Sequence, residues 1–162
     1  MHIMDESSSN SLEERDLALV SQTCLVRAAR RTANLLTRVY ATRLSDARIE
    51  PTQFTLLVAI AVGKARSASE LAGQIGIERS TLVRNLGPML SAGLVVAEPG
   101  EGRRLTYQLT APGQVKLDQA LVHWRKIQKD LLDAMPEGSL EAVQGQLALL
   151  RRAARQAGSE SD

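Results

Sequence analysis

A short stretch near the middle of the chain carries the side-chain chemistry needed to read nucleic-acid bases. Its polar members are Arg79, Ser80, Thr81, Arg84 and Asn85. Arginine donates in fork geometry to guanine or phosphate, asparagine can pair bidentately with adenine, and hydroxyl groups suit phosphates and base edges. Apolar residues recur between them at helical spacing: Leu82, Leu86, Met89 and Leu90. The pattern predicts a helix with a buried face and a polar outer face, and a merely solvated helix face is the open alternative.

The residues before this stretch predict the first helix of a helix-turn-helix. Ser67-Ala68-Ser69-Glu70 is a capping-box sequence, in which the Ser67 hydroxyl accepts from the Glu70 amide while the Glu70 carboxylate reaches back. The helix it opens would place Leu71, Ala72 and Ile75 inside and end at Gly76. The polar helix would then begin at Glu78, after the three- to four-residue turn expected of this motif.

Pro88 lies inside the predicted polar helix and should bend it, because proline removes a backbone hydrogen bond and clashes with the preceding turn. Base-reading residues usually occupy the N-terminal half of such a helix, so a bend there would spare them. Gly93 is well placed as the left-handed residue that ends the helix.

A glycine-bracketed basic hairpin follows, Glu98-Pro99-Gly100-Glu101-Gly102-Arg103-Arg104. On its returning strand Leu105, Tyr107 and Leu109 alternate with polar residues, which predicts one buried face. Arg103 and Arg104 would lie at the tip or just past it, where a long cation can enter a minor groove or contact a phosphate. An exposed arginine pair on a turn is commonplace. The pair indicates DNA binding only in combination with the predicted helix-turn-helix before it.

The elements that must position these residues are helices on both sides. Residues 12 to 44 contain no Pro or Gly and predict one long helix with two apolar stripes. The first stripe holds Leu17, Val20, Cys24, Ala28, Leu35 and Val39, and the second holds Leu25, Ala29, Leu36, Tyr40 and Leu44. Burial on two sides suggests that one side covers its own domain and the other a partner subunit. A central helix in a monomeric bundle is the alternative.

Three more helices complete the prediction. Pro51 suits the first turn of a core helix that ends at Gly63, with an apolar face of Phe54, Leu57, Val58, Ala61 and Val62. Thr110 can cap a helix from Ala111 to Met135, with Leu117, Leu121, Trp124, Leu131 and Met135 on one stripe. Ser139 begins the last helix, with Leu140, Val143, Leu147 and Leu150 inward and Arg151, Arg152 and Arg155 expected to favour its negative C-terminal end.

These elements predict a mainly α fold with a small β-wing: a winged helix-turn-helix flanked by N- and C-terminal dimerisation helices. The expected divisions are a disordered leader at 1 to 11, dimerisation helices at 12 to 48 and 111 to 157, a DNA-binding lobe at 50 to 110, and a tail at 158 to 162.

Composition limits the function classes. The chain has 162 residues, 44% of them hydrophobic, which suits one cored domain. No apolar run approaches a bilayer span and the N-terminus is not a signal peptide, so a cytoplasmic protein without membrane contact is expected. The net charge is +2, and residues 1 to 16 contribute −4 (five acidic residues, one arginine), which leaves +6 for the rest. Two His and one Cys cannot form a structural zinc site, and no catalytic constellation or phosphate loop appears, so we expect no enzyme, metal or cofactor.

The order of parts resembles the MarR family of winged-helix transcriptional regulators (multiple antibiotic resistance regulators) over roughly residues 12 to 156. The family's wing pattern, Asp-x-Arg followed by five residues and Leu-Thr, is matched here by Glu101-Gly102-Arg103 and then Leu109-Thr110. Glu101 replaces the usual Asp, and its implied role is to brace the wing through a salt link to Arg103. Further matches are Gln53-Phe54, Glu70-Leu71-Ala72, Ser80-Thr81 and Gly93-Leu94.

The resemblance implies a homodimer whose first, fifth and sixth helices form the interface. Each subunit would insert its fourth helix into a major groove of double-stranded DNA and its wing into the flanking minor groove. Two-fold symmetry then predicts a pseudo-palindromic operator with half-site centres about 34–36 Å apart. The protein would be a transcriptional repressor relieved by a small-molecule effector.

Two regulatory hypotheses follow from the same resemblance. Many relatives bind small aromatic or anionic ligands between the dimerisation helices and the DNA-binding lobe, and Arg30, Asn34, Tyr40 and Phe54 are candidates to line such a cleft. The alternative places the two aromatic residues in the core and the other two on a solvated surface.

Cys24 is a candidate redox sensor, because a peroxide-sensing branch uses a Cys near the start of the first helix and a Tyr where Tyr40 stands. Cys24 lies two residues from that branch's position, which Val26 occupies, and a buried apolar Cys is the alternative. A winged helix that docks another protein without binding DNA also remains open.

Overall fold

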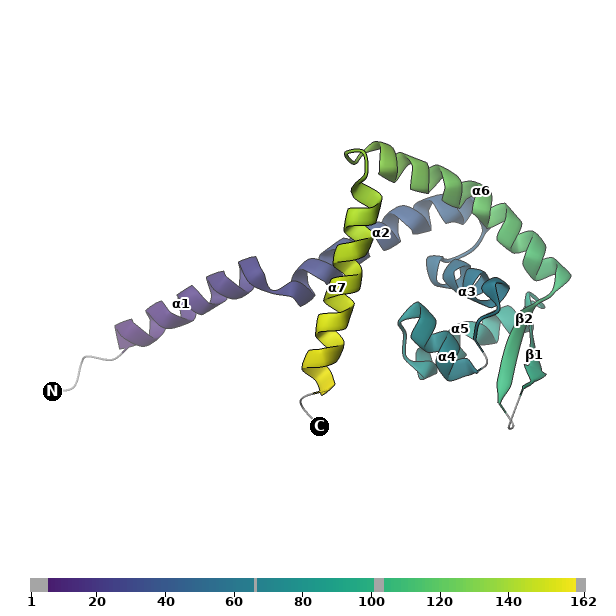
Figure 1. Ribbon diagram of the computed structural model, residues 1–162, viewed down its shortest axis with the longest axis horizontal. Helices are drawn as coiled ribbons and strands as arrows, with labels where there is room; N and C mark the ends of the chain where they lie inside the picture. Colours follow the sequence, from purple (N-terminus) through teal and green to yellow (C-terminus); the bar gives the residue numbers. More distant parts are fainter. Residues whose placement is uncertain (1–5, 66, 101–103, 160–162) are drawn as a thin grey trace.

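The protein, seen in a computed structural model, is mainly helical with one two-stranded antiparallel sheet (Figure 1), which confirms the predicted fold class. The structure describes residues 6–65, 67–100 and 104–159, with side chains from residue 13 onward. The elements in chain order are α1 (Glu6–Thr23), α2 (Leu25–Leu44), the 3₁₀ helix η1 (Ser45–Ala47), α3 (Pro51–Val62), α4 (Ala68–Ile75), α5 (Arg79–Ser91), β1 (Val95–Pro99), β2 (Leu105–Leu109), α6 (Ala111–Asp133) and α7 (Ser139–Ser159).

The N-terminal region is two helices where one was predicted. Cys24 adopts an extended conformation with ψ of 106° and separates α1 from α2. Just before it, the Ser21 hydroxyl donates to the Ala18 carbonyl at 2.8 Å and the Thr23 hydroxyl donates to the Leu19 carbonyl at 2.8 Å. Such side-chain bonds compete with the helical ladder and bend helices, which explains a break without Pro or Gly.

Residues 6 to 11, predicted to belong to a disordered leader, form the first turns of α1 instead. No Pro or Gly interrupts residues 6 to 23, so helical hydrogen bonding continues back through the serine-rich stretch.

Helices α3, α4 and α5 and the hairpin pack around one hydrophobic core. The largest fully buried side chains of this lobe are Leu56, Leu57, Leu71, Leu82, Leu86 and Met89. The predicted inner face of α5 is confirmed except for Leu90, which is 37% exposed.

The predicted inner face of α3 is only half right. Phe54 and Leu57 are buried, but Ala61 and Val62 are exposed, while Leu56 and Ile60 are buried instead. The cause is that α3 packs against α4, α5 and β2 on one side and against α2 and α6 on another. Its buried surface is therefore wider than one stripe.

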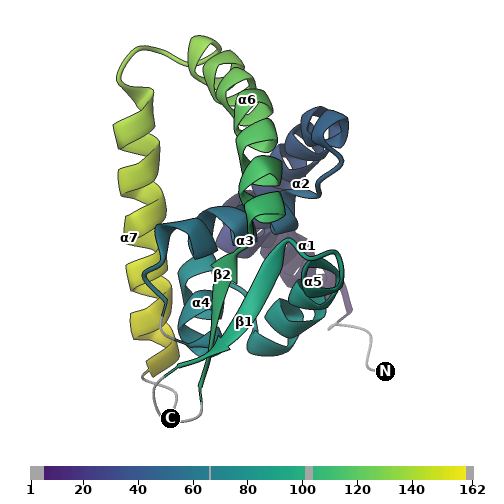
Figure 2. The same cartoon turned by 90° about the vertical axis from the view of Figure 1, so that its right-hand side faces the viewer.

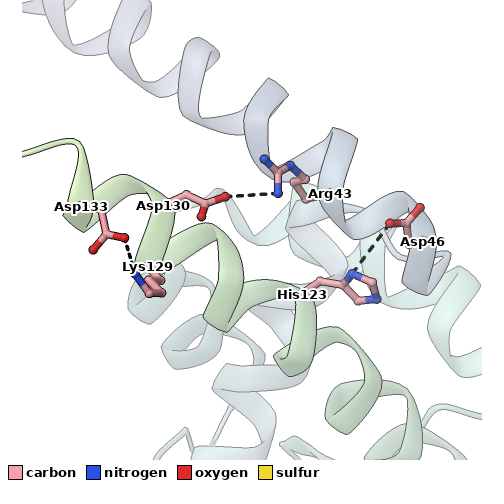
Figure 3. Close-up of polar contacts among 6 residues, drawn as sticks. All are labelled: Arg43, Asp46, His123, Lys129, Asp130 and Asp133. Atoms are coloured by element: carbon pink, nitrogen blue, oxygen red, sulfur yellow. Dashed lines mark hydrogen bonds and ion pairs between the residues drawn. The ribbon is translucent and has the colours of Figure 1, made fainter.

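Helix α6 joins this lobe to α2 (Figures 1 and 3). Leu117, Ala120 and Ile127 are buried in this contact. Around them, the Arg43 guanidinium lies 3.3 Å from the Asp130 carboxylate, and His123 lies 3.9 Å from Asp46 (Figure 3). Lys116 Nζ donates to the Ala47 carbonyl at 3.1 Å, which ties η1 to α6. Lys129 pairs with Asp133 within α6 itself (Figure 3).

Helices α1 and α7 stand apart from the lobe in Figure 1. No described residue of α7 is buried, and its predicted inward residues Val143 and Leu147 are 44% and 49% exposed. On α1, Leu17 is 68% exposed. Two helices with apolar side chains in water therefore flank a lobe with a closed core.

None of the described helices is both long enough and apolar enough to span a bilayer.

Candidate nucleic-acid interface

Local hydrogen bonds fix the turn between α4 and α5. The Glu70 amide donates to Ser67 Oγ at 3.1 Å, as the capping sequence predicts. At the other end of α4, Gly76 is left-handed with φ of 73°, and the Ile77 amide donates to the Ala72 carbonyl at 3.0 Å. This position favours glycine, because glycine has no Cβ and adopts the left-handed conformation without the steric cost that other residues bear. The turn therefore holds α5 in a set orientation relative to α4.

The predicted polar face of α5 is largely open to solvent. Arg79, Ser80 and Arg84 are exposed, and Thr81 and Asn85 are partly buried. Within the described residues no ion pair engages Arg79 or Arg84, so their guanidinium groups are available for a ligand. An exposed, unpaired arginine near a helix start suits a phosphate or a guanine edge.

Asn85 has a partner on its own helix, because its Nδ2 donates to the Thr81 carbonyl at 2.8 Å. One of the two amide donors is thus already used in the free protein. Bidentate pairing with adenine, predicted from the sequence, requires this bond to be exchanged for one to the base.

The helix runs through Pro88 as far as Ser91, and the Ala92 amide donates to the Pro88 carbonyl at 2.9 Å. Gly93, with φ of 66°, then ends α5 as predicted. The Gly93 amide donates to the Leu90 carbonyl and the Leu94 amide to the Met89 carbonyl, both at 3.0 Å, which is the Schellman pattern. The bend at Pro88 stays a prediction, and the base-reading candidates all lie before it.

The hairpin forms in the predicted place. Strands β1 and β2 pair from Val95 opposite Leu109 to Pro99 opposite Leu105, and the Gly100 amide donates to the Arg104 carbonyl at 2.6 Å. Arg104, immediately before β2, is exposed. Glu101 and Arg103, with their implied salt link, lie outside the described residues.

The predicted alternation on β2 fails at its outer end. Tyr107 and Leu109 are partly buried, but Leu105 is 49% exposed. Leu105 pairs with Pro99 at the turn end of the ladder, where the hairpin projects beyond the helices of the lobe (Figure 2).

Thr110 and Gly113 join the exit of α5 to the start of α6. The Thr110 hydroxyl donates to the Gly93 carbonyl at 2.5 Å and accepts from the Gly113 amide at 3.1 Å. The Thr110 amide donates to the Leu94 carbonyl at 3.1 Å. A Cβ on Gly113 would lie 1.9 Å from that Leu94 oxygen, so only glycine fits there. The cap at Thr110 was predicted from the sequence, but the role of Gly113 was not. A glycine in the first turn of a predicted helix was the feature that could have indicated it.

The arrangement matches solved structures along nearly their whole length. MosR, a transcriptional regulator of M. tuberculosis, is 32% identical, with 83% of this chain and 97% of MosR covered at a TM-score of 0.74. Its structure in complex with DNA is 33% identical, with 83% and 98% covered at a TM-score of 0.73. The chain belongs to the MarR family of winged-helix transcriptional regulators. This is a family of regulators, not of enzymes.

A more distant MarR-family likeness is to CouR, a transcriptional repressor bound to a 23-mer DNA duplex. It is 22% identical, with 82% of this chain and 95% of CouR covered at a TM-score of 0.71, and shows the shared fold. No family model and no curated protein sequence matches the chain.

The four candidates for a MarR-type effector cleft are not brought together within one chain. Phe54 is buried in the core, and the Tyr40 hydroxyl donates to Gln128 Oε1 at 3.2 Å. Burial raises the pKa of the Tyr40 phenol, so it stays a neutral donor. Arg30 and Asn34 are exposed nearer the N-terminal end of α2. Arg30 lies about 15 Å along the helix from Tyr40.

An open hollow of about 530 Å³ lies elsewhere, between the end of α3, strand β2 and the start of α6. Its lining includes Ile60, Tyr107, Gln108 and Gln114, and none of the four candidates. The effector cleft stays a prediction.

Cys24 is partly buried at the junction of α1 and α2. Tyr40 lies sixteen residues away along α2, about 24 Å, so the two side chains do not meet within one subunit.

Proposed function

We propose that this protein is a homodimeric, sequence-specific DNA-binding transcriptional regulator. The observation that carries the proposal is the open, unpaired arginine face at the start of α5, with the exposed Arg104 on the adjoining hairpin. The start of α5 would enter a major groove, where Arg79 and Arg84 contact bases or phosphates and Ser80 and Thr81 bind the backbone. The hairpin would reach the flanking minor groove through Arg103 and Arg104. The DNA complexes of MosR and CouR support this reading.

Dimerisation is supported by the apolar side chains left in water on α1, α2 and α7. Leu17, Leu25, Leu35 and Leu147 are 68%, 62%, 55% and 49% exposed in the single chain. Apolar surface gathered on elements with no intrachain partner marks an interface. Two-fold pairing through these helices and α6 would space the two α5 helices for a pseudo-palindromic operator, with half-site centres about 34–36 Å apart.

We further propose repression that a small aromatic or anionic ligand relieves. Arg30 and Asn34 support it, because they lie one turn apart on the same face of α2 and both are exposed. A guanidinium and an amide so placed suit a carboxylate. Tyr40 and Phe54 would contribute from the core side only if the dimer places a ligand beside them.

The test begins with fragments of the source organism's own DNA that the protein selects. On such a fragment, the Arg79→Ala/Arg84→Ala variant is expected to bind at least about 30-fold more weakly than wild type, since each good base or phosphate contact contributes about 1–3 kcal/mol. Arg125→Ala/Lys126→Ala, which removes the same charge from the exposed surface of α6, is the matched control. Equally weakened DNA binding in both variants would show that the loss comes from net charge alone. It would contradict the proposed DNA contacts of Arg79 and Arg84.

Sedimentation of wild type and both variants tests the dimer separately. A dimer at micromolar concentration is expected for all three. A monomeric wild type would refute the two-fold operator, whatever the DNA affinity.

A further inference from the structure

The C-terminal part of α7 carries three arginines that the proposed DNA-binding surface does not include. Arg151, Arg152 and Arg155 are all exposed, and we call them the α7 arginine cluster. The sequence suggests that they stabilise the negative end of the helix. However, α7 continues to Ser159 and its last turn holds no basic residue, so the cluster lies too far back for that role.

The cluster has no acidic neighbour along its own helix. From Ala142 to Ser159 the chain contains no Asp or Glu, and Glu160 and Asp162 lie outside the described residues. Among the residues that the structure describes, no ion pair or side-chain hydrogen bond engages these three guanidinium groups. Three unpaired like charges within five residues repel one another, and this repulsion is relieved when an anion binds.

Two members of the cluster stay accessible after α7 packs in a dimer. The apolar stripe of α7 consists of Leu140, Val143, Leu147 and Leu150. At about 100° per residue, Arg152 and Arg155 lie roughly 160° and 100° around the helix from the centre of this stripe, whereas Arg151 lies only about 60° from it, at the edge of the stripe. Packing of the stripe on a second subunit would therefore leave Arg152 and Arg155 in water.

The C-terminal part of α7, which carries the cluster, ends on the same side of the molecule as the turn ends of β1 and β2. Figures 1 and 2 share their vertical axis, and in both the C-terminal end of α7 lies level with α4 and the far ends of β1 and β2. Helix α1 continues past α7 on the side away from the lobe (Figure 1). Because α1 and α7 carry the unpartnered apolar residues, the second subunit belongs on that side. The α7 arginine cluster then lies between the two DNA-binding lobes.

We propose that the α7 arginine cluster is a third DNA contact of each subunit, which binds backbone phosphates of the operator segment between the two half-sites. Arginine suits this role because its planar fork binds phosphate oxygens bidentately. The contact carries no base information. It adds affinity and salt dependence, and it favours a duplex that continues unbroken from one half-site to the next. This inference rests on the proposed dimeric DNA-binding function.

The test compares Arg152→Ala/Arg155→Ala with Arg125→Ala/Lys126→Ala on one selected genomic duplex of about 40 base pairs, long enough for both half-sites about 34–36 Å apart. Each lost phosphate contact removes about 0.9 from the slope of log affinity against log salt. Two arginines per subunit make four contacts in a dimer, so their loss should flatten the slope by about 3.6, with a roughly tenfold or larger loss of affinity in 0.1 M salt. The control should change the slope by less than one. Hydroxyl-radical footprinting of the α7 variant should lose protection only between the half-sites.

Several outcomes separate the possible failures. An α7 variant with the slope and central footprint of the control would overturn the inference while the proposed function stands. A wild type that binds no genomic fragment would overturn both. Arg152→Lys/Arg155→Lys keeps the charge and should keep most of the slope. Sedimentation must show both arginine-to-alanine pairs as dimers, and a slope lost only together with dimerisation would assign the cluster to the interface and contradict phosphate binding.

Discussion

The lobe from α3 to β2 buries its apolar side chains within one chain, whereas helices α1 and α7 leave theirs exposed. The lobe buries Leu56, Leu57 and Leu82 completely within a single chain. Helix α7 buries none of its residues, although its leucines recur with the same helical spacing. The difference teaches that apolar periodicity reports a buried face without saying which chain covers it. In the lobe the covering elements lie nearby in sequence, whereas for α1 and α7 we assign them to a second subunit.

The sharpest test of this contrast compares one leucine from each region. Leu82→Ala removes a side chain with no exposed surface and should lower the free energy of unfolding by about 2–5 kcal/mol. Leu147→Ala, at a half-exposed position, should cost little in a dilute monomer and should mainly weaken the dimer. Urea unfolding at two protein concentrations measures both effects. Equal, concentration-independent losses would show that α7 is buried by its own chain.

A second comparison uses two helical glycines. Gly113→Ala places a Cβ 1.9 Å from the Leu94 oxygen, so α6 must shift, at a cost of about 1–3 kcal/mol. Gly145→Ala in α7 meets no atom within 4 Å and should stabilise the helix by about 0.5–1 kcal/mol, because alanine is the better helix former. Thermal unfolding of the two variants should therefore move in opposite directions. A destabilised Gly145→Ala dimer would reveal close approach of the partner at that point.

The smallest expected effect concerns the junction between α1 and α2. Cys24→Ser changes a partly buried side chain of similar size, so stability should change by less than about 1 kcal/mol. DNA binding of wild type and variant should respond alike to hydrogen peroxide if Cys24 is an apolar junction residue. Loss of binding in wild type alone would establish the redox hypothesis instead.

Sequence reasoning succeeded where a structure is set by adjacent residues. Ser67, Gly76, Gly93 and Thr110 each satisfy the backbone of the helix beside them, so their roles can be read from a few neighbouring positions. The limits of α4, α5 and the hairpin followed from them. The candidate reading residues could likewise be placed on the open face of α5, although the bond from Asn85 to its own helix could not be foreseen.

The errors concern properties that distant elements decide. The buried face of α3 depends on helices both before and after it, which is why Ile60 was missed and Val62 was misplaced. Leu105 continues the alternation of β2 but lies opposite Pro99 at the turn end of the hairpin, where it is 49% exposed. The break at Cys24 depends on weak competition between side-chain and backbone hydrogen bonds, which residue types alone do not resolve.

The Thr110 junction also has a mechanical consequence. The Thr110 hydroxyl bonds both the Gly93 carbonyl, just after α5, and the Gly113 amide in the first turn of α6, so it couples the orientations of the two helices. Helix α6 has 23 residues and is therefore a lever arm about 34 Å long, and a tilt of about 5° at one end moves the other by about 3 Å. A displacement of that size is comparable to the rise between successive base pairs. In the proposed dimer, a small rearrangement of the helices between the subunits would in this way become a mismatch between the two α5 helices and the spacing of the major grooves.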